Sequence, residues 1–290
     1  MGLVGKAVAY GAVTVINAIS CGFGAALSVD LSTEAKVELT NVPGRIEGRI
    51  MSDPDESTVL IEKTVKCVFK SLGLEKEYGA YVETRSNIPI ARGLKSSSAA
   101  ANAVALSVFA ALDEEIDDLA LVNLGVDAAI DAGVTITGAF DDACASYFSD
   151  IVVTDNYNRK ILKQFHLEEK HPVLICAPSQ KAYTAKSDVE RMRLVADEVK
   201  ALHRLALLGE YWSAMTLNGL VYSTVLGYNP NVALDALAAG ALAASLSGKG
   251  PSVAAVVPRG KVKDVKDAWG KYGCDIIETR INSEKAHIVL

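Results

Sequence analysis

Residues 89–99, Pro-Ile-Ala-Arg-Gly-Leu-Lys-Ser-Ser-Ser-Ala, place three hydroxyl groups directly before an Ala-rich apolar stretch, residues 99–112, which predicts a helix. Gly93 allows a tight or positive-φ backbone, and Ser96–Ser98 are residues that favour the N-cap of a helix. The unpaired N–H groups and the positive dipole end of such a helix form a natural site for phosphate. Hydroxyl groups at the same place can bind Mg²⁺ or hydrogen-bond to phosphate oxygens. The alternative is an ordinary serine-capped helix in the core.

A second segment carries two adjacent carboxylates. Residues 134–146 read Val-Thr-Ile-Thr-Gly-Ala-Phe-Asp-Asp-Ala-Cys-Ala-Ser and contain Asp141 and Asp142. Phosphoryl transfer to a hydroxyl group calls for one carboxylate near that hydroxyl, to accept or orient its proton. Adjacent side chains point to different sides of most backbones, so we expect the two aspartates to have different roles. The alternative is that both cap a short helix over residues 143–148.

A third segment, residues 240–252, ends in Ser-Gly-Lys-Gly-Pro-Ser before an apolar strand over residues 253–257. Gly248 and Gly250 flank Lys249 and allow the backbone to approach a ligand closely. The alternative for this segment alone is a plain turn between a helix and a strand.

These segments need a scaffold, and the hydrophobic pattern predicts one of mixed strands and helices. Predicted strands cover residues 5–10, 12–19, 26–31, 34–40, 78–84, 160–166, 172–177, 252–257, 274–280 and 285–290. Predicted helices cover residues 56–72, 99–112, 117–131, 143–148, 187–207, 209–226, 231–246 and 261–271. A chain of 290 residues favours two domains, and the polar stretch 150–158 predicts the boundary between them. Abundant Ala and Val favour close packing of helices on sheets.

Composition excludes several other functions. The net charge of −6, with no dense Lys/Arg block, argues against a nucleic-acid partner. No uninterrupted apolar run is long enough for a membrane span, and the N-terminus does not have the pattern of a signal peptide. Walker A, G-x-G-x-x-G, H-R-D and H-E-x-x-H motifs are absent from the sequence. The five cysteines lack a C-x-x-C spacing, which predicts reduced thiols in a cytoplasmic protein rather than disulfides or a zinc site.

The first of these motifs resembles the phosphate-binding signature of the GHMP kinases, which include galactokinase, homoserine kinase, mevalonate kinase and phosphomevalonate kinase. The residues that fall on the signature are Pro89, Gly93, Leu94, Ser96, Ser97 and Ala99. Asp141 falls on the catalytic aspartate of the family, and residues 240–252 resemble its third motif, which closes over the site. Residues 6–11 resemble the first strand, in which a lysine faces that aspartate. Many members continue with Glu-His, where this chain has Ala12-Val13.

Over nearly its whole length the chain is most similar to the archaeal shikimate kinases within this family. The resemblance implies an α+β, two-domain GHMP kinase fold. Its N-terminal domain, residues 1–155, would be ribosomal protein S5 domain 2-like, and its C-terminal domain, residues 156–290, ferredoxin-like. The implied reaction is ATP-dependent phosphorylation of shikimate to shikimate 3-phosphate, on the way to chorismate and the aromatic amino acids. The reaction would require ATP and Mg²⁺. The protein would be cytoplasmic, and a homodimer is possible.

The resemblance also assigns site residues. Asp141 would be the catalytic base, assisted by Lys6, and Ser97 would bind Mg²⁺, with Asp127 or Asp131 as a second ligand. The ATP-binding residues would be Pro89, Ile90, Ala91, Arg92, Gly93, Leu94, Lys95, Ser96, Ser97, Ser98, Ala99, Gly248 and Gly250. Candidate partners of the shikimate hydroxyls are Thr14, Asn17, Thr135 and Thr137, and candidate cations for its carboxylate are Arg92, Lys95 and Lys186. Each of these could instead be a solvated surface residue.

Three other functions remain as alternatives: two other kinase activities and a non-catalytic binding function. Homoserine kinases as a family lack the catalytic aspartate, so Asp141 counts against that activity. Mevalonate kinases usually keep Glu-His after the first-strand glycine, so Ala12-Val13 counts against that one. A non-catalytic metabolite-binding protein is disfavoured because Lys6, Ser96–Ser98 and Asp141 are all retained.

Overall fold

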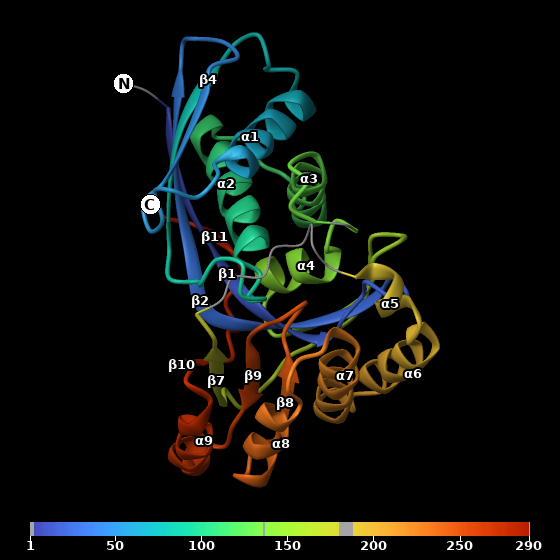
Figure 1. Ribbon diagram of the computed structural model, residues 1–290. Helices are drawn as coiled ribbons and strands as arrows, with labels where there is room; N and C mark the ends of the chain where they lie inside the picture. The colour runs from blue at the N-terminus through green and yellow to red at the C-terminus, as the bar shows by residue number, and fades with distance from the viewer. Residues whose placement is uncertain (1–2, 136, 180–187, 290) are drawn as a thin grey trace.

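The computed structural model describes residues 3–135, 137–179 and 188–289 (Figure 1). Seven strands of this part form the first sheet, in the order β11-β1-β2-β4-β3, with β5 paired to β2 and β6 to β5. Their bounds are β1 Val4–Ile16, β2 Phe23–Thr40, β3 Ile46–Ile50, β4 Gly79–Ser86, β5 Ile151–Asp155, β6 Lys160–Phe165 and β11 His287–Ile288. All of these pairs are antiparallel except β3 with β4.

Helices α1 Val59–Leu72, α2 Ser96–Leu112 and α4 Phe140–Phe148 pack against the first sheet, and α3 Asp118–Asp131 packs on these three helices (Figure 1). The central helix, α2, lies unusually close to β1. A Cβ atom added to Gly5 would lie 2.1 Å from the carbonyl oxygen of Ser107, and the Ser107 hydroxyl donates to the carbonyl of Ala35. Small side chains on both elements permit this approach, as the composition predicted.

A second sheet, wholly antiparallel, has the order β10-β7-β9-β8. Its strands are β7 Pro172–Ala177, β8 Ala243–Leu246, β9 Val253–Val256 and β10 Asp275–Arg280. Helices α5 Val189–Arg193, α6 Ala196–Leu207, α7 Tyr211–Leu226, α8 Asn231–Ala238 and α9 Val262–Trp269 accompany it, with 3₁₀ turns η2 Arg259–Lys261 and η3 Gly270–Tyr272 on either side of α9. Trp269 is fully buried and donates from Nε1 to the carbonyl of Val232.

The long strand β1 contributes to two hydrophobic cores. Ala7, Ala9 and Ala12 pack in the core between the first sheet and α1–α4. Val13, Val15 and Ile16, further along the same strand, pack in the core that surrounds the second sheet. The β1–β2 ribbon therefore ties the two halves together.

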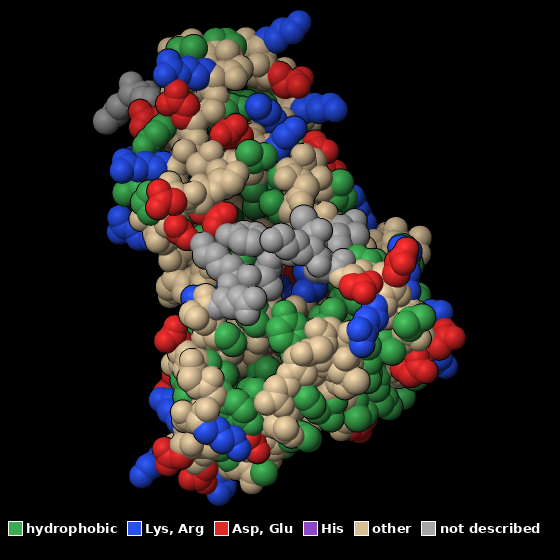
Figure 2. All heavy atoms as spheres, in the orientation of Figure 1, with side chains coloured by type: hydrophobic (Ala, Val, Ile, Leu, Met, Phe, Trp, Pro, Cys, Tyr) green, Lys and Arg blue, Asp and Glu red, His purple; other side chains and the backbone are tan. Residues whose placement is uncertain are grey.

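On the face shown in Figure 2, acidic and basic side chains are interspersed, and apolar side chains gather over the lower half. Exposed leucines of that half include Leu194, Leu208, Leu217 and Leu234. Among the helices of the described residues, none combines the length and apolar character needed to cross a membrane.

Several predicted elements were wrong in their extent. The four strands expected between residues 5 and 40 are two continuous strands, β1 and β2. The helix predicted over residues 231–246 ends at Ala238, because Gly240 has a φ of +101°, and residues 243–246 form β8. Strands β3 and β5 were not predicted. The predicted domain boundary at residue 155 falls between β5 and β6, which pair in one sheet; the division into domains 1–155 and 156–290 stays a prediction.

The prediction of reduced cysteines is wrong for one pair. Cys176 is the last residue but one of β7 and Cys274 directly precedes β10, and the two form a disulfide with their Cα atoms 5.5 Å apart. They are 98 residues apart in the sequence, and the pairing of β7 with β10 brings them together. Spacing along the chain could not show this. Cys21, Cys67 and Cys144 are free.

Candidate active site

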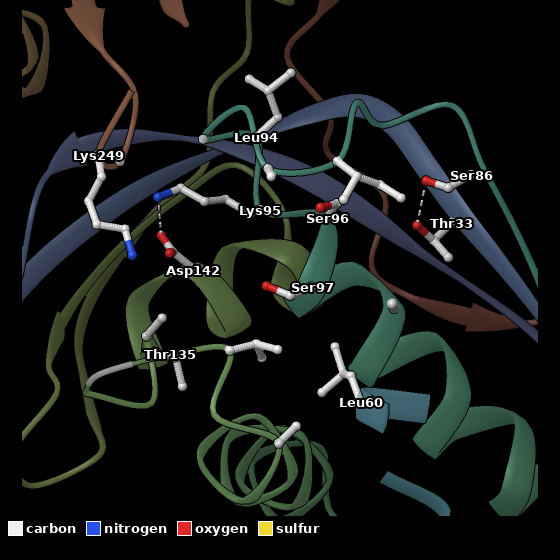
Figure 3. A pocket seen from close by; sticks show the side chains of 18 of the residues that line it. Thr33, Leu60, Ser86, Leu94, Lys95, Ser96, Ser97, Thr135, Asp142 and Lys249 are labelled. Atoms are coloured by element: carbon white, nitrogen blue, oxygen red, sulfur yellow. Dashed lines mark hydrogen bonds and ion pairs between the residues drawn. The ribbon is translucent and has the colours of Figure 1, made fainter. Parts of the chain in front are cut away.

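A cavity of about 470 Å³ is lined by residues from both halves of the molecule. Three segments meet there: the start of α4, the loop between β8 and β9, and the loop of residues 89–95 before α2, which we call the phosphate loop (Figure 3). The sequence-predicted residues that line it are Thr14, Asn17, Ile90, Ala91, Gly93, Leu94, Lys95, Ser96, Ser97, Thr135, Thr137, Asp141, Gly248 and Gly250. Three motifs that are far apart in the sequence therefore share one site.

The phosphate loop has a left-handed backbone at three positions before α2. Ala91, Gly93 and Lys95 have φ values of +57°, +81° and +63°. The helix begins at Ser96, one residue after Lys95, and no side chain caps it. The prediction that the serines act as N-caps is therefore wrong, because they occupy the first turn itself. Their N–H groups lack partners within the helix, and the side chains of Ser96 and Ser97 line the cavity. Both groups are available to an anionic ligand.

The loop between β8 and β9 lies directly on the phosphate loop. The Ser247 hydroxyl donates to the carbonyl of Gly93 at 2.6 Å. A Cβ atom at Gly93 would lie 2.2 Å from the carbonyl oxygen of Ser247, so only glycine fits there. Thr14 Oγ1 accepts from the N–H of Gly248 at 2.8 Å, and Asn17 Nδ2 donates to the carbonyl of Gly248 at 2.8 Å. Thr14 and Asn17, predicted to bind substrate, thus hold the β8–β9 loop in place.

Two lysines and a carboxylate form a charged cluster in the cavity. Lys95 Nζ lies 2.8 Å from Asp142 Oδ1. Lys249 points toward this pair from the β8–β9 loop (Figure 3). Burial, with the charge of Lys95, lowers the pKa of Lys249 to about 8, although Asp142 acts in the opposite direction. A cluster with two ammonium groups and one paired carboxylate attracts an anion.

Asp141 lies in the first turn of α4 and is 4% exposed. Asn156 Nδ2 donates to Asp141 Oδ1 at 2.7 Å. Burial, reinforced by the charge of Asp142, raises the pKa of Asp141 to about 7, while Lys95 and the Asn156 amide oppose the rise. Gly24 of β2 makes room for the carboxylate, since a Cβ atom there would lie 2.5 Å from Oδ2. A carboxyl group with its pKa near neutrality is suited to general base catalysis.

Neither aspartate caps the helix, which excludes the capping alternative. Helix α4 begins at Phe140, so both aspartates lie inside its first turn, and the N-cap residue is Ala139, whose φ is +48°. The aspartates also differ in their partners: Asp142 pairs with Lys95, and Asp141 with a neutral amide. This difference agrees with the prediction that they have separate roles.

Several predicted site residues do not line the cavity: Lys6, Pro89, Arg92, Ser98, Ala99, Asp127 and Asp131. Lys6 is exposed on β1, about 25 Å along the strand from Thr14. The predicted pairing of Lys6 with Asp141 is therefore wrong, and Lys95 is the lysine beside the aspartates.

Contacts elsewhere, or exposure at the surface, explain why the other charged residues of this set do not line the cavity. Arg92 lies 3.7 Å from Asp275 and donates to the carbonyl of Ser179, which turns it away from the cavity. Asp127 pairs with Arg159 at 2.6 Å on the surface, and Asp131 is also exposed. Neither is placed to bind a metal ion in the cavity. Lys186, a candidate cation for a carboxylate, lies outside the described residues.

Sequence reasoning missed the apolar end of the cavity. Its apolar side chains are Ile50, Val59, Leu60 and Ile61, from β3 and the start of α1. Polar side chains from β2, β4 and the segment before α1 lie beside them: Thr33, Glu56, Ser57, Thr84 and Ser86. Thr33 and Ser86 share a hydrogen bond of 2.8 Å across β2 and β4 (Figure 3). No motif marks these positions, because an apolar surface needs only the ordinary alternation of strand and helix residues. Asn156 was missed because its segment was interpreted as the boundary between two domains.

The donor set in the cavity fits a Mg²⁺ ion that is held mainly by a ligand's phosphates. Mg²⁺ usually keeps several waters and takes one or two protein oxygens with substrate phosphates. The Ser97 hydroxyl lines the cavity at the start of α2. Within the described residues, no cluster of three His, Cys, Asp or Glu side chains could hold a metal ion alone.

Comparison with known proteins identifies relatives over almost the entire chain. Residues 59–150 match the model for the GHMP kinases N terminal domain, and residues 199–274 match GHMP kinases C terminal. The chain is 48% identical over 288 residues to the shikimate kinase of Methanosarcina mazei, with 99% of this chain and 97% of that protein covered. It is 40% identical over 270 residues to the shikimate kinase of Pyrococcus furiosus, covering 92% and 96% of the two chains.

Solved structures share the fold at low sequence identity. The Methanococcus jannaschii mevalonate kinase superposes with a TM-score of 0.78 at 18% identity, covering 96% of this chain and 98% of that one. A homoserine kinase from Cytophaga hutchinsonii gives 0.77 at 19% identity, covering 100% and 98%. The α+β fold predicted from the sequence is confirmed.

Proposed function

The chain belongs to the GHMP kinase family, and we propose that its cavity transfers the γ-phosphoryl group of ATP to the 3-hydroxyl group of shikimate. The observation that carries this proposal is the meeting of the phosphate loop, the Lys95–Asp142 pair and the buried Asp141 in one cavity. The acceptor follows from the shikimate kinases, to which the chain is 40–48% identical over nearly full length.

We infer one orientation for ATP in the cavity. Its triphosphate would lie over residues 93–97, where first-turn N–H groups and the serine hydroxyls face the cavity. Its adenine would occupy the apolar end formed by Ile50, Val59 and Leu60. Mg²⁺, held by the phosphates and Ser97, would neutralise charge on the β- and γ-phosphates.

The acceptor would lie at the charged end of the cavity. Asp141 would orient the acceptor hydroxyl and take its proton as the phosphoryl group arrives. Lys95 and Lys249 supply positive charge for the transferred group, and in this kind of reaction positioning and electrostatics provide most of the catalysis. Thr135 and Thr137 also line the cavity and would offer hydroxyl groups to the remaining ring hydroxyls.

The alternatives are less well supported. The homoserine and mevalonate kinases share the fold at under 20% identity, which carries no argument about substrate. A non-catalytic binding protein would not need an aspartate whose pKa is raised to about 7 by burial. The phosphorylated product would feed the synthesis of chorismate and aromatic amino acids. A cytoplasmic location and a homodimer remain predictions.

A coupled ADP-release assay with Mg·ATP tests the function, using shikimate beside homoserine, mevalonate and galactose. We expect turnover with shikimate alone. An Asp141→Asn variant purified in the same way is the control, because a contaminating kinase would give equal rates in both preparations. Turnover with another acceptor only, or with none of the four, would refute the proposed substrate.

A further inference from the structure

Asn156 lies just after β5, in the polar stretch 150–158 that was predicted to be the domain boundary. It is buried, and its N–H donates to the carbonyl of Gly22 at 2.8 Å. Its side chain makes two hydrogen bonds of 2.7 Å each. Nδ2 donates to Asp141 Oδ1, and Oδ1 accepts from the Thr154 hydroxyl. The backbone and both ends of the amide are therefore fixed.

The direction of these bonds is set by the charge of the carboxylate. An ionised aspartate can only accept hydrogen bonds, so the NH₂ end of the Asn156 amide must face Asp141. The carbonyl end then faces Thr154, whose hydroxyl must donate to it. Thr154 also lies 3.4 Å from the carbonyl of Gly24, which is a longer alternative acceptor. Thr154 is fully buried on β5, so its hydroxyl favours one orientation of the amide.

We propose that Asn156 is a positioning residue for the catalytic base, which holds the Asp141 carboxylate in place and favours its ionised form, and that Thr154 orients the Asn156 amide. This inference rests on the proposed role of Asp141. It assigns a catalytic contribution to two residues that do not line the cavity.

The groups that surround Asp141 leave few ways to keep it ionised. The carboxylate of Asp142, the next residue of α4, opposes the charge of Asp141, whereas Lys95 of the phosphate loop and the backbone N–H of Asp142 support it. Cys144 of α4, Cys21 of the β1–β2 turn and Tyr222 of α7 interact electrostatically with Asp141. Burial raises the pKa of each of these three above its ordinary value, so they are neutral near pH 7.

The Asn156 amide therefore acts in the same direction as Lys95, against burial and Asp142. A hydrogen bond to a charged group is stronger than one between neutral groups. Losing it would raise the pKa of Asp141 beyond about 7 and reduce the ionised fraction at neutral pH.

The test is the pH profile of kcat/KM for shikimate, which reports the free enzyme. In Asn156→Ala we expect the acid limb to move upward by about one pH unit. The rate of the variant should be several-fold below that of the wild type at pH 7, and the two rates should converge near pH 9, where Asp141 is ionised in both and any loss from Lys249 is shared. Thr154→Val should move the limb in the same direction by less. Asn158→Ala is the matched control, since Asn158 bonds only to the exposed Asp155 in the same turn.

An unchanged acid limb with a loss that is equal at every pH would overturn the inference, since a merely structural residue would behave in this way. If Asn156→Ala does not fold, the pH profile of Thr154→Val replaces it as the test, and an acid limb that does not move upward would again overturn the inference. A wild-type protein inactive on shikimate would instead refute the proposed function. In that case a ¹³C titration of the Asp141 carboxyl, assigned with Asp141→Asn, tests the inference alone. A midpoint that does not rise in Asn156→Ala would contradict it.

Discussion

The two adjacent aspartates show how neighbouring residues of one type acquire different chemistry. Asp142 faces the phosphate loop and pairs with Lys95. Asp141 turns toward β2, where it is enclosed by Gly24, the Asn156 amide and the surrounding core. Enclosure penalises its charge, which is why its pKa rises to about 7. The side chain that is harder to ionise is therefore the one suited to accept a proton at neutral pH.

Replacing this carboxyl by an amide should remove the base and keep the fold. We expect Asp141→Asn to lower kcat by about 10²- to 10⁴-fold, with ATP affinity by calorimetry unchanged because the phosphate loop is intact. In the wild type, kcat/KM should fall tenfold per pH unit below about 7, where Asp141 becomes protonated. A variant that retains most of its kcat would exclude Asp141 as the base.

The same substitution should affect stability with a definite sign. The pKa of Asp141 in the folded protein lies above its usual value of 3.8. Protonation therefore stabilises the fold, and this stabilisation is lost as the pH rises through about 7. Asp141→Asn should consequently raise Tm relative to the wild type at pH 8 and less so at pH 5. An equal effect at both pH values would contradict the raised pKa.

At the scale of single residues, the sequence identified side chains that belong to motifs and missed those that act through packing. Asp141, Ser96 and Ser97 were identified by the motifs on which they fall, and all three line the cavity. Lys6 was misplaced because the motif says nothing of where a residue lies along a 13-residue strand. Asn156 could not be found, since its role depends on the meeting of β5, α4 and the turn before β2.

At the scale of elements, the site depends on the contact between two loops that begin or end secondary structure. The phosphate loop leads into α2, and the loop between β8 and β9 lies on it through Gly93 and Ser247. Thr14, near the end of β1, and Asn17, just after it, hold the β8–β9 loop through hydrogen bonds to the backbone of Gly248. The phosphate loop and the β8–β9 loop therefore support each other through direct contacts between Gly93 and Ser247.

Gly93→Ala tests this contact. The added methyl group would meet the Ser247 carbonyl at 2.2 Å, on a backbone with φ +81°. We expect the β8–β9 loop to move away, with KM for ATP raised by about tenfold or more and Tm lowered. Gly44→Ala is the matched control, because Gly44 has a φ of +75° and nothing within 4 Å.

The control separates backbone strain from loop contact. Gly44→Ala should lose about 1 kcal/mol of stability with no change in KM for ATP. Equal KM values in the two variants would mean that the contact between the loops has no part in ATP binding.

Hydrophobic periodicity predicted most of the helices that cover the first sheet. It did not predict how far the strands extend or which strands pair. β1 and β2 continue past positions where the pattern is interrupted, because their two ends are buried in different cores. Residues 243–246 were assigned to a helix because small apolar residues are common to helices and to buried strands. They form β8 because β9 supplies its hydrogen-bond partner.

At the scale of the whole molecule, the C-terminal segment returns to the first sheet. Its strand β11 pairs with β1, far from β10 in the second sheet. Between them, the carbonyl of Asn282 accepts from the N–H of Asp150, and the N–H of Asn282 donates to the carbonyl of Ser28. No composition signal marks this return, since the segment is short and polar. It makes the first sheet depend on the last ten residues of the chain.

The Asp150 carboxylate secures this connection and gives the last prediction. Its side chain is 3% exposed, lies 3.1 Å from Lys170 Nζ and accepts from the Ser283 hydroxyl at 2.5 Å. Asp150→Ala would remove a buried acceptor from Lys170, which is 30% exposed, and from Ser283, so we expect a loss of about 2–3 kcal/mol in the free energy of urea unfolding. Asp127→Ala, which breaks an exposed ion pair with Arg159, should lose about 1 kcal/mol or less. If the two variants lose equal amounts, the buried carboxylate does not hold the C-terminal segment to the first sheet.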